Sequence, residues 1–349
     1  MIEVDGSYGE GGGQMLRTAL GLSIITNQPI HLFNIRANRP SPGLKPQHYT
    51  TISILKTISN ASVKGLKENA TEITFSPGKI TEGTYHFNIG TAGSIVLIFQ
   101  AIILGCLKTN DTIQIQVSGG TDVKWSPSWD YFSQVFLQVL HTMGIHVDCT
   151  LEKRGYYPKG GGSAILTLKP NERLSSLSWN KQMAVSEIHG LIHSANLPNH
   201  IAERMKHACL QTIGSSNIKG HISVDQTTSL SPGTGMTLWT KESNGCLGSI
   251  GLGERGVSAE SIGKKTSEQL LSYLNTGCTV DPYLCDQIIP FLALAKQDSV
   301  VNTFVLSNHA KTNIWLIKKF YTTEPLFEIT EKKGYYSLLV HGKNERLKQ

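Results

Sequence analysis

The stretch TYHFNIGTAGSIVLIFQAIILGCLKTNDTIQIQVSG, residues 84–119, contains a complete strand–helix–strand unit. Apolar and polar residues alternate at both ends, over 84–90 and 112–119, which predicts two strands. The apolar run between them predicts a buried helix at about 93–107. This run is shorter than the roughly 18–20 residues that a membrane span needs, and it carries Gln100. We therefore expect no membrane association.

The order of elements around this stretch occurs three times. The middle copy continues with a helix at 129–143 and strands at 145–153 and 163–170. The first copy has strands at 1–6, 30–36, 61–66 and 71–76 and helices at 14–26 and 47–59. The last copy has strands at 277–281, 299–306, 326–330 and 335–340 and helices at 283–296 and 311–320. Each copy has the order β-α-β-α-β-β.

We predict an α/β (α+β) fold in which residues 1–179 and 276–349 form a large domain of three repeated units. The units cover about 1–79, 80–179 and 276–349. Residues 180–275 do not fit the repeat. Their pattern of a strand at 184–194, a helix at 200–213, strands at 221–227 and 237–241, and a helix at 258–274 predicts an inserted small α/β domain, with a Gly/Ser/Pro-rich loop at 229–236.

Composition limits the classes of function. The chain has 349 residues, a formal net charge of +6 and a pI near 8.9, which favour a polyanionic partner. The N-terminus has no pattern of a secretory signal, so a reducing, cytoplasmic location is expected. The six cysteines form no CxxC pair, which argues against a zinc or redox motif.

A glycine-rich segment, GSYGEGGGQMLR at 6–17, precedes the first helix. Glycines at this place allow the backbone to approach an anion, and the helix N-terminus offers free N–H groups. Glu10 would repel a phosphate unless it holds a divalent cation that the phosphate shares. The alternative is a simple tight turn.

Two further segments carry reactive or basic side chains. IRANRPSPGLKPQH at 35–48 presents basic residues on a proline-stiffened loop, which favours phosphate recognition over a solvated basic loop. LSNHAKTN at 306–313 places His309 at a strand-to-helix junction, where a helix N-terminus favours the neutral, nucleophilic imidazole. A purely structural histidine is the alternative. His189 and His193 are four residues apart, but they lie in a strand-like pattern that disfavours a helical metal site.

Five segments together resemble the RNA 3'-terminal phosphate cyclase family: GSYGEGGGQ (6–14), GTAGS (90–94), YPKGGG (157–162), DPYLCDQ (281–287) and HAKTN (309–313). Their order and spacing cover essentially the whole chain. The resemblance implies three β-α-β-α-β-β units similar to the C-terminal domain of bacterial translation initiation factor three, with a smaller inserted domain.

The resemblance also implies a reaction and its residues. His309 would attack ATP to form a covalent histidine–AMP, and the AMP would pass to an RNA 3'-phosphate before a 2',3'-cyclic phosphate closes. Glu10 would bind a divalent metal, Mg or Mn. The implied ATP-binding residues are Gln100, Pro127, Tyr283, Leu284, Cys285, Asp286 and Gln287. The candidates for triphosphate or RNA-phosphate contacts are Arg17, Arg36, Arg39, Gln47 and His48.

Other functions stay open at this point. A catalytically inactive cyclase-like protein that binds RNA in ribosome assembly would be expected to lack the nucleophile. An enolpyruvyl transferase has related repeats but does not need HAKTN, and a plain nucleotide-binding regulator is a further alternative. The presence of His309, Glu10 and YLCDQ favours the enzyme. The oligomeric state is left open.

Overall fold

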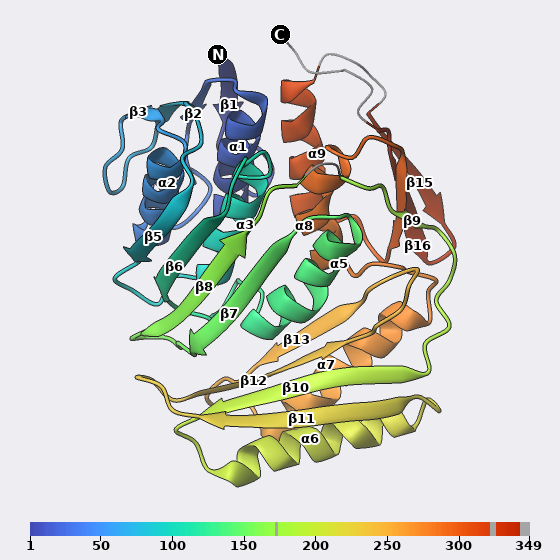
Figure 1. The fold of residues 1–349 in the computed structure, drawn as a ribbon. Coiled ribbons are helices and arrows are strands. Elements are labelled where there is room, and N and C mark those ends of the chain that lie inside the picture. Colours follow the sequence, from blue (N-terminus) through green and yellow to red (C-terminus); the bar gives the residue numbers. More distant parts are fainter. Residues whose placement is uncertain (172–173, 322–325, 343–349) are drawn as a thin grey trace.

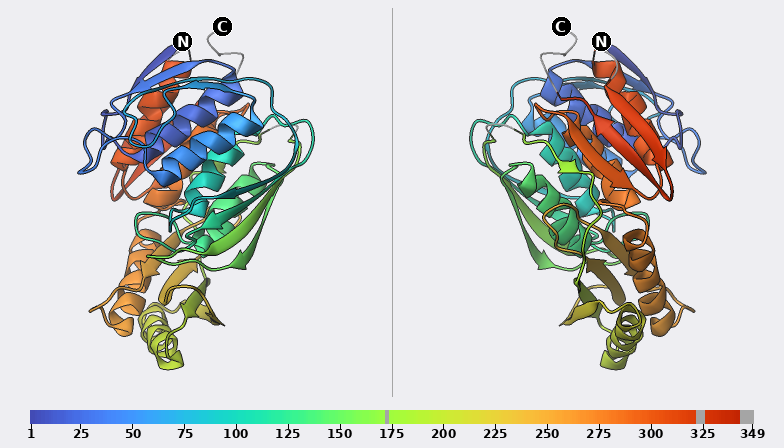
Figure 2. Two further views of the ribbon diagram at one scale, coloured as in Figure 1. Left: turned by 90° about the vertical axis from the view of Figure 1, so that its left-hand side faces the viewer. Right: turned by 90° about the vertical axis from the view of Figure 1, so that its right-hand side faces the viewer.

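The computed structural model describes residues 1–171, 174–321 and 326–342 (Figure 1). Within these residues the strands form four sheets of four strands each. Three sheets and their helices form the larger part of the molecule, and the fourth sheet lies with α6 (Asn199–Gly214) and α7 (Ala259–Leu274) at one end (Figures 1 and 2).

The first two units repeat one topology, which confirms the predicted fold class. Unit one consists of β1 (Ile2–Asp5), α1 (Gly13–Thr26), β2 (Ile30–Phe33), α2 (Pro46–Ile58), β3 (Ser62–Lys64) and β4 (Ile73–Ser76). Unit two consists of β5 (Gly83–Asn88), α3 (Ile95–Gly105), β6 (Ile113–Gly119), α4 (Trp129–Tyr131), the π-helical turn η1 (Phe132–Phe136), α5 (Leu137–Thr142), β7 (Val147–Lys153) and β8 (Gly162–Leu168). Their sheet orders, β1-β2-β4-β3 and β5-β6-β8-β7, are equivalent, with the first pair parallel and the others antiparallel.

The third unit has the same sheet, but its first strand comes from elsewhere. It contains α8 (Pro282–Leu292), β14 (Ser299–Thr303), α9 (Asn308–Phe320), β15 (Phe327–Lys332) and β16 (Tyr335–Val340). The strand expected at 277–281 is wrong, since only Val280 makes isolated bridges there. The parallel neighbour of β14 is β9 (Ser178–Trp179), which precedes the inserted segment. The chain therefore leaves this sheet after Trp179 and returns to it at Val280.

The inserted segment forms the fourth sheet and a core of its own. Its elements are β10 (Glu187–Ala195), α6 (Asn199–Gly214), β11 (Lys219–Thr227), β12 (Gly233–Trp239), β13 (Gly248–Leu252) and α7 (Ala259–Leu274), with the sheet order β11-β10-β12-β13. Its buried apolar residues run from Met183 to Cys278. The loop expected at 229–236 is partly wrong, because residues 233–236 begin β12. The domain limits at 180 and 275 stay a prediction.

Close packing of helices holds the three units together. A side chain at Gly21 of α1 would collide with Leu104 of α3, so the glycine permits the close approach of these helices. Phe136 packs edge-on against Phe291 of α8, with ring centroids 5.8 Å apart. Burying such side chains stabilises the fold by about 1.5–3 kcal/mol each. In the described part of the chain, no helix has the length and apolar character needed to cross a membrane.

Candidate active site

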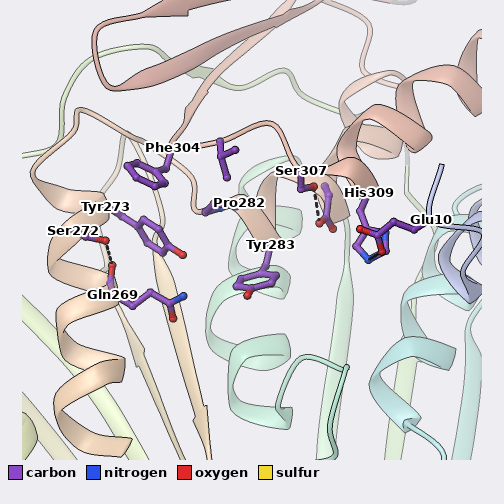
Figure 3. Close-up of a pocket in the computed structure, with 11 residues that line it drawn as sticks. Glu10, Gln269, Ser272, Tyr273, Pro282, Tyr283, Phe304, Ser307 and His309 are labelled. Carbon is purple, nitrogen blue, oxygen red and sulfur yellow. Dashed lines mark hydrogen bonds and ion pairs between the residues drawn. The ribbon is translucent and has the colours of Figure 1, made fainter. Parts of the chain in front are cut away.

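A cleft of about 530 Å³ opens between α7, α8 and the start of α9 (Figure 3). Four of the residues that line it belong to the predicted site: Glu10, Tyr283, Asp286 and His309. The others are Gln269, Ser272, Tyr273, Pro282, Phe304, Val305 and Ser307, which sequence reasoning missed. Its volume lies in the range of about 300–1,000 Å³ that is typical of small-molecule sites.

His309 is the second residue of α9, whereas the sequence pattern predicted a helix start at 311. Ser307 caps this helix, because its Oγ accepts a hydrogen bond from the N–H of Ala310 at 2.9 Å. The imidazole Nε2 lies 3.4 Å from Oε2 of Glu10. Burial lowers the pKa of His309 below 6.5, with a further contribution from the positive charges of Arg17 and Arg39, while Glu10 opposes the shift. Neutral imidazole, with a free electron pair on one nitrogen, is therefore favoured.

The turn that carries Glu10 depends on glycine. Gly9 and Gly11 have φ angles of +61° and +56°. This left-handed backbone conformation is unfavourable for residues that have a Cβ atom. A Cβ at Gly9 would also meet Oγ1 of Thr312 on α9. The turn can therefore approach α9 closely only with glycine at this position.

Aromatic stacking joins the same turn to α9. The ring of Tyr8 lies parallel to that of Trp315, with an interplanar angle of 8° and centroids 3.9 Å apart. The ammonium group of Lys319 lies 4.6 Å from the Trp315 ring. Tyr8 is two residues from Glu10, and Trp315 is on the helix of His309. The stack therefore helps to set the distance between this carboxylate and this imidazole.

The Glu10 carboxylate lies between a histidine and an arginine. Its Oε2 is 3.4 Å from Nη2 of Arg39 as well as 3.4 Å from Nε2 of His309, and the Glu10 side chain is 39% exposed. Mg²⁺ is commonly held by one or two carboxylates together with substrate phosphates. This accessible carboxylate fits such a shared metal, with Arg39 beside it to contact the phosphates.

The charged Arg17 and the neutral His48 lie side by side at the starts of α1 and α2, next to Gly13. The described residues give the Arg17 guanidinium no hydrogen bond and no ion pair, although Asp286 exerts an attraction on it. Burial lowers the pKa of Arg17 to about 10, which leaves it charged at neutral pH. Burial, together with Arg17, Arg36 and Lys45, lowers the pKa of His48 to about 3. A Cβ at Gly13 would collide with the His48 ring, so α1 and α2 meet at their N-termini.

The N-terminus of α1 is open to an anion. Its N-cap is Gly12, no described side chain caps it, and its first turn has no acidic residue. Free N–H groups and the helix dipole favour negative charge at such an end. With Arg17 and Arg39 beside it, this region is the most suitable place for phosphate near His309.

Asp286 lines the cleft and contacts the start of α9. Burial raises its pKa well above the usual value, which favours the protonated carboxyl. Ser307 donates a hydrogen bond to its Oδ2 at 3.3 Å, and the Asn313 side chain donates to its carbonyl at 2.7 Å. These contacts join α8 to the first turns of α9.

Two predicted residues, Arg36 and Gln47, have backbone partners that give them structural roles. Arg36 Nη1 donates to the carbonyls of Ser41 and Gly43, at 2.9 and 3.1 Å, so it stiffens its own loop. Gln47 Oε1 accepts from the N–H of Ser94 at 2.8 Å, which links α2 to the start of α3.

The remaining predicted ATP contacts lie outside the lining of the cleft. Gln100 Nε2 of α3 donates a hydrogen bond to Gln287 Oε1 of α8 at 2.6 Å, so each amide gives the other a hydrogen-bond partner. The side chains of Leu284 and Cys285 are fully buried in the large core and do not face the cleft. Pro127 is half-buried on the loop after β6, and its carbonyl accepts from Ser126 Oγ at 3.0 Å.

A second group of titratable side chains, Asp122, Asp130 and His193, has ligand atoms close enough for a metal ion. However, the Arg154 guanidinium already contacts Asp122 at 3.2 Å and Asp130 at 3.0 Å, and these side chains are buried, so a metal ion would have to displace a buried arginine. We therefore interpret the group as a buried ionic network. His189 and His193 are both in strand β10, as the sequence pattern predicted, and His189 stacks on His221 rather than pairing with His193.

The chain matches the family model described as RNA 3'-terminal phosphate cyclase over residues 8–325. An RNA 3'-terminal phosphate cyclase of Methanopyrus kandleri is 40% identical over 341 residues, which are 96% of each chain. Proteins of the same name from Archaeoglobus fulgidus and Pyrobaculum aerophilum are 42% and 38% identical, over 92% and 98% of this chain and 95% and 98% of theirs. The chain belongs to the RNA 3'-terminal phosphate cyclase family.

Proposed function

We propose that this protein uses ATP to convert an RNA 3'-terminal phosphate to a 2',3'-cyclic phosphate through a covalent histidine–AMP. The observation that carries this proposal is the position of His309 Nε2, 3.4 Å from the Glu10 carboxylate, in a cleft beside the open end of α1. A neutral imidazole, a carboxylate suited to a shared metal and nearby cations are what nucleotidyl transfer to histidine requires.

In the first step, Nε2 of His309 attacks the α-phosphorus of ATP. A phosphorus–nitrogen bond forms, the bond to the bridging oxygen breaks, and pyrophosphate leaves. Arg17 and Arg39 stabilise the negative charge that develops on the leaving group. Glu10 would hold the Mg²⁺ or Mn²⁺, whose charge neutralises the phosphates when it is bound.

The adenosine is assigned to the side of the site formed by α8. Tyr283 is 51% exposed, so its ring is available for stacking on a base. Asp286 lies in the same cleft, and the Gln100–Gln287 amide pair offers further donors and acceptors nearby. Pro127 would contact the adenine from the loop after β6. The side chains of Leu284 and Cys285 would form part of the core beneath the nucleotide and would not touch it.

The second and third steps transfer and release AMP. An oxygen of the RNA 3'-phosphate attacks the phosphorus of the adenylate, the bond to His309 breaks, and the imidazole recovers its electron pair. The neighbouring 2'-hydroxyl then attacks the RNA phosphorus, its proton leaves to solvent, and AMP departs. This closure is intramolecular, so it benefits from proximity.

A catalytically inactive cyclase-like protein that binds RNA in ribosome assembly is the alternative. Such a protein has no need of an imidazole whose pKa is lowered beside an accessible carboxylate. The contacts around His309 therefore favour the enzyme.

The test is to incubate the protein with ATP, Mg²⁺ and an RNA labelled at its 3'-phosphate. We expect the label to become resistant to phosphatase, with one pyrophosphate and one AMP released per RNA end. RNA that binds but keeps a phosphatase-sensitive end, with no consumption of ATP, would support the inactive alternative.

A further inference from the structure

Trp125 is unusual in both exposure and backbone conformation. It lies on the loop between β6 and α4, and at 95% exposure it is the most exposed large apolar residue in the described part of the chain. Its φ angle is +61°, in a region that bulky residues rarely adopt. An exposed indole and a strained backbone both disfavour the folded state. Such strain is commonly retained where a residue has a functional role.

The loop that carries Trp125 is held in place on both sides. Ser126 Oγ lies 2.5 Å from Ser94 Oγ at the start of α3. Lys124 Nζ forms an ion pair with Glu254 of the inserted segment at 2.9 Å. The N–H of Thr121 donates to the carbonyl of Gly155 at 2.8 Å. The indole is therefore exposed to solvent on a loop that is held by contacts on both sides, and its exposure is not that of a side chain on a loosely held loop.

A series of contacts connects this loop with the proposed phosphate site. Ser94, which Ser126 contacts, donates its N–H to Gln47. The next residue, His48, packs against Gly13 at the start of α1. The N-termini of α1, α2 and α3 thus follow one another between the phosphate site and Trp125. Each of these ends carries a partial positive charge, which suits a strand of phosphates.

The proposed reaction gives the RNA a direction. Attack on the histidine-bound phosphorus is in line, so the RNA phosphate enters opposite Nε2 of His309, where pyrophosphate left. We assign Arg17 and Arg39 to that leaving group. An RNA strand that continues from its 3'-phosphate at these arginines can follow the three helix N-termini towards Trp125.

We propose that Trp125 stacks on a base of single-stranded RNA upstream of the reacting 3' end. Stacking on an indole is tolerant of sequence, because every base has a π-face, and it adds affinity to the phosphate contacts. This inference rests on the proposed function, and it adds the position of the RNA strand.

The test compares Trp125→Ala and Trp125→Phe with the native protein on a single-stranded RNA decamer that has a 3'-phosphate. We expect Trp125→Ala to raise KM for RNA by about fivefold to 150-fold, the range for loss of one base–aromatic stack. Trp125→Phe should recover most of the affinity. The rate of AMP transfer to His309, measured without RNA, should stay unchanged. Ile329→Ala is the matched control, since Ile329 is exposed on β15, outside the cleft and away from this loop.

A set of decamers with one abasic nucleotide locates the stacked base. The effect of Trp125→Ala should disappear for the RNA that lacks the stacking base and persist for the others. An unchanged KM for RNA, or an effect that persists with every abasic RNA, would overturn the inference.

Other outcomes would also decide against it. Slower AMP transfer without RNA would assign Trp125 to the nucleotide, and a changed sedimentation coefficient of the RNA-free variant would assign it to a protein interface. Failure of the native protein to form an AMP adduct would contradict the proposed function and this inference together. A native adduct with an unaltered KM in Trp125→Ala would contradict the inference alone.

Discussion

At the scale of single residues, the proposed chemistry depends on the protonation of one imidazole. Burial and the charges of Arg17 and Arg39 lower the pKa of His309, and Glu10 raises it in part. The nucleophilic form is the neutral one, which is present above this pKa. The same four residues therefore determine both the charge of the site and the fraction of reactive enzyme.

We predict that the rate of AMP transfer rises with pH, with a midpoint below the usual histidine value of 6.5. Arg39→Ala removes a cation and should move this midpoint to higher pH, whereas Glu10→Gln removes an anion and should move it lower. Initial rates of AMP transfer in the RNA-free protein give the midpoints, whose positions are independent of the maximal rates. Midpoints that are the same in all three proteins would contradict this assignment.

The motifs and the family resemblance that they carry predicted four residues that the structure brings together. Glu10, Tyr283, Asp286 and His309 line one cleft, as expected of one site. Gln269, Tyr273 and Phe304 were missed, because they come from α7 of the inserted segment and from the residue after β14, where no local pattern marks them. The partners of Arg36 and Gln47 are backbone groups that only the folded chain brings near.

At the scale of elements, the important contact is the one between the glycine-rich turn and α9. The Tyr8–Trp315 stack and the glycine at position 9 hold this turn against the helix of His309. Aromatic pairs of this kind contribute about 0.5–1.5 kcal/mol beyond their buried area. The geometry of Glu10 and His309 therefore depends on a contact outside the cleft.

We predict that Trp315→Ala lowers the rate of AMP transfer by about tenfold to 100-fold, since small displacements of reacting groups have effects of this size. It should also raise the concentration of Mg²⁺ needed for half-maximal rate, while Trp315→Phe should restore both. Lys319→Ala keeps the ring pair and is the control. Native rates and native Mg²⁺ dependence in Trp315→Ala would exclude the positioning role.

Local patterns predicted most elements but not all their limits. The predicted start of α9, residue 311, is three residues beyond its first residue, Asn308, because Ser307 caps the helix ahead of the apolar pattern. The short strand β9 was missed, since two residues give no alternating pattern and their partners in β14 are 122 residues away in the chain.

At the scale of the whole molecule, a buried ionic network joins unit two to the inserted segment. Arg154 contacts Asp122, Asp130 and Asp225, and the Asp122 carboxylate lies 3.4 Å from His193 of β10. The repeat of the large domain was predictable because its pattern is local to each copy. This network was not, since it joins residues from distant segments.

We predict that Arg154→Met destabilises the protein by about 3–5 kcal/mol, because it leaves buried carboxylates without their cation. Lys169→Met is the control: it removes an exposed ion pair with Asp148 and should cost only about 0–1 kcal/mol. Free energies of unfolding from urea titration give both values. Equal, small effects of the two substitutions would show that the network does not hold the segments together.

The most direct measurement of the central claim uses ATP labelled at its α-phosphate. The protein is mixed with this ATP and Mg²⁺, denatured, and examined for label that stays on the chain. We predict an acid-labile, alkali-stable adduct in the native protein that is absent from a folded His309→Ala variant. No adduct in the native protein, or an equal adduct in His309→Ala, would contradict the assignment of His309 as the nucleophile.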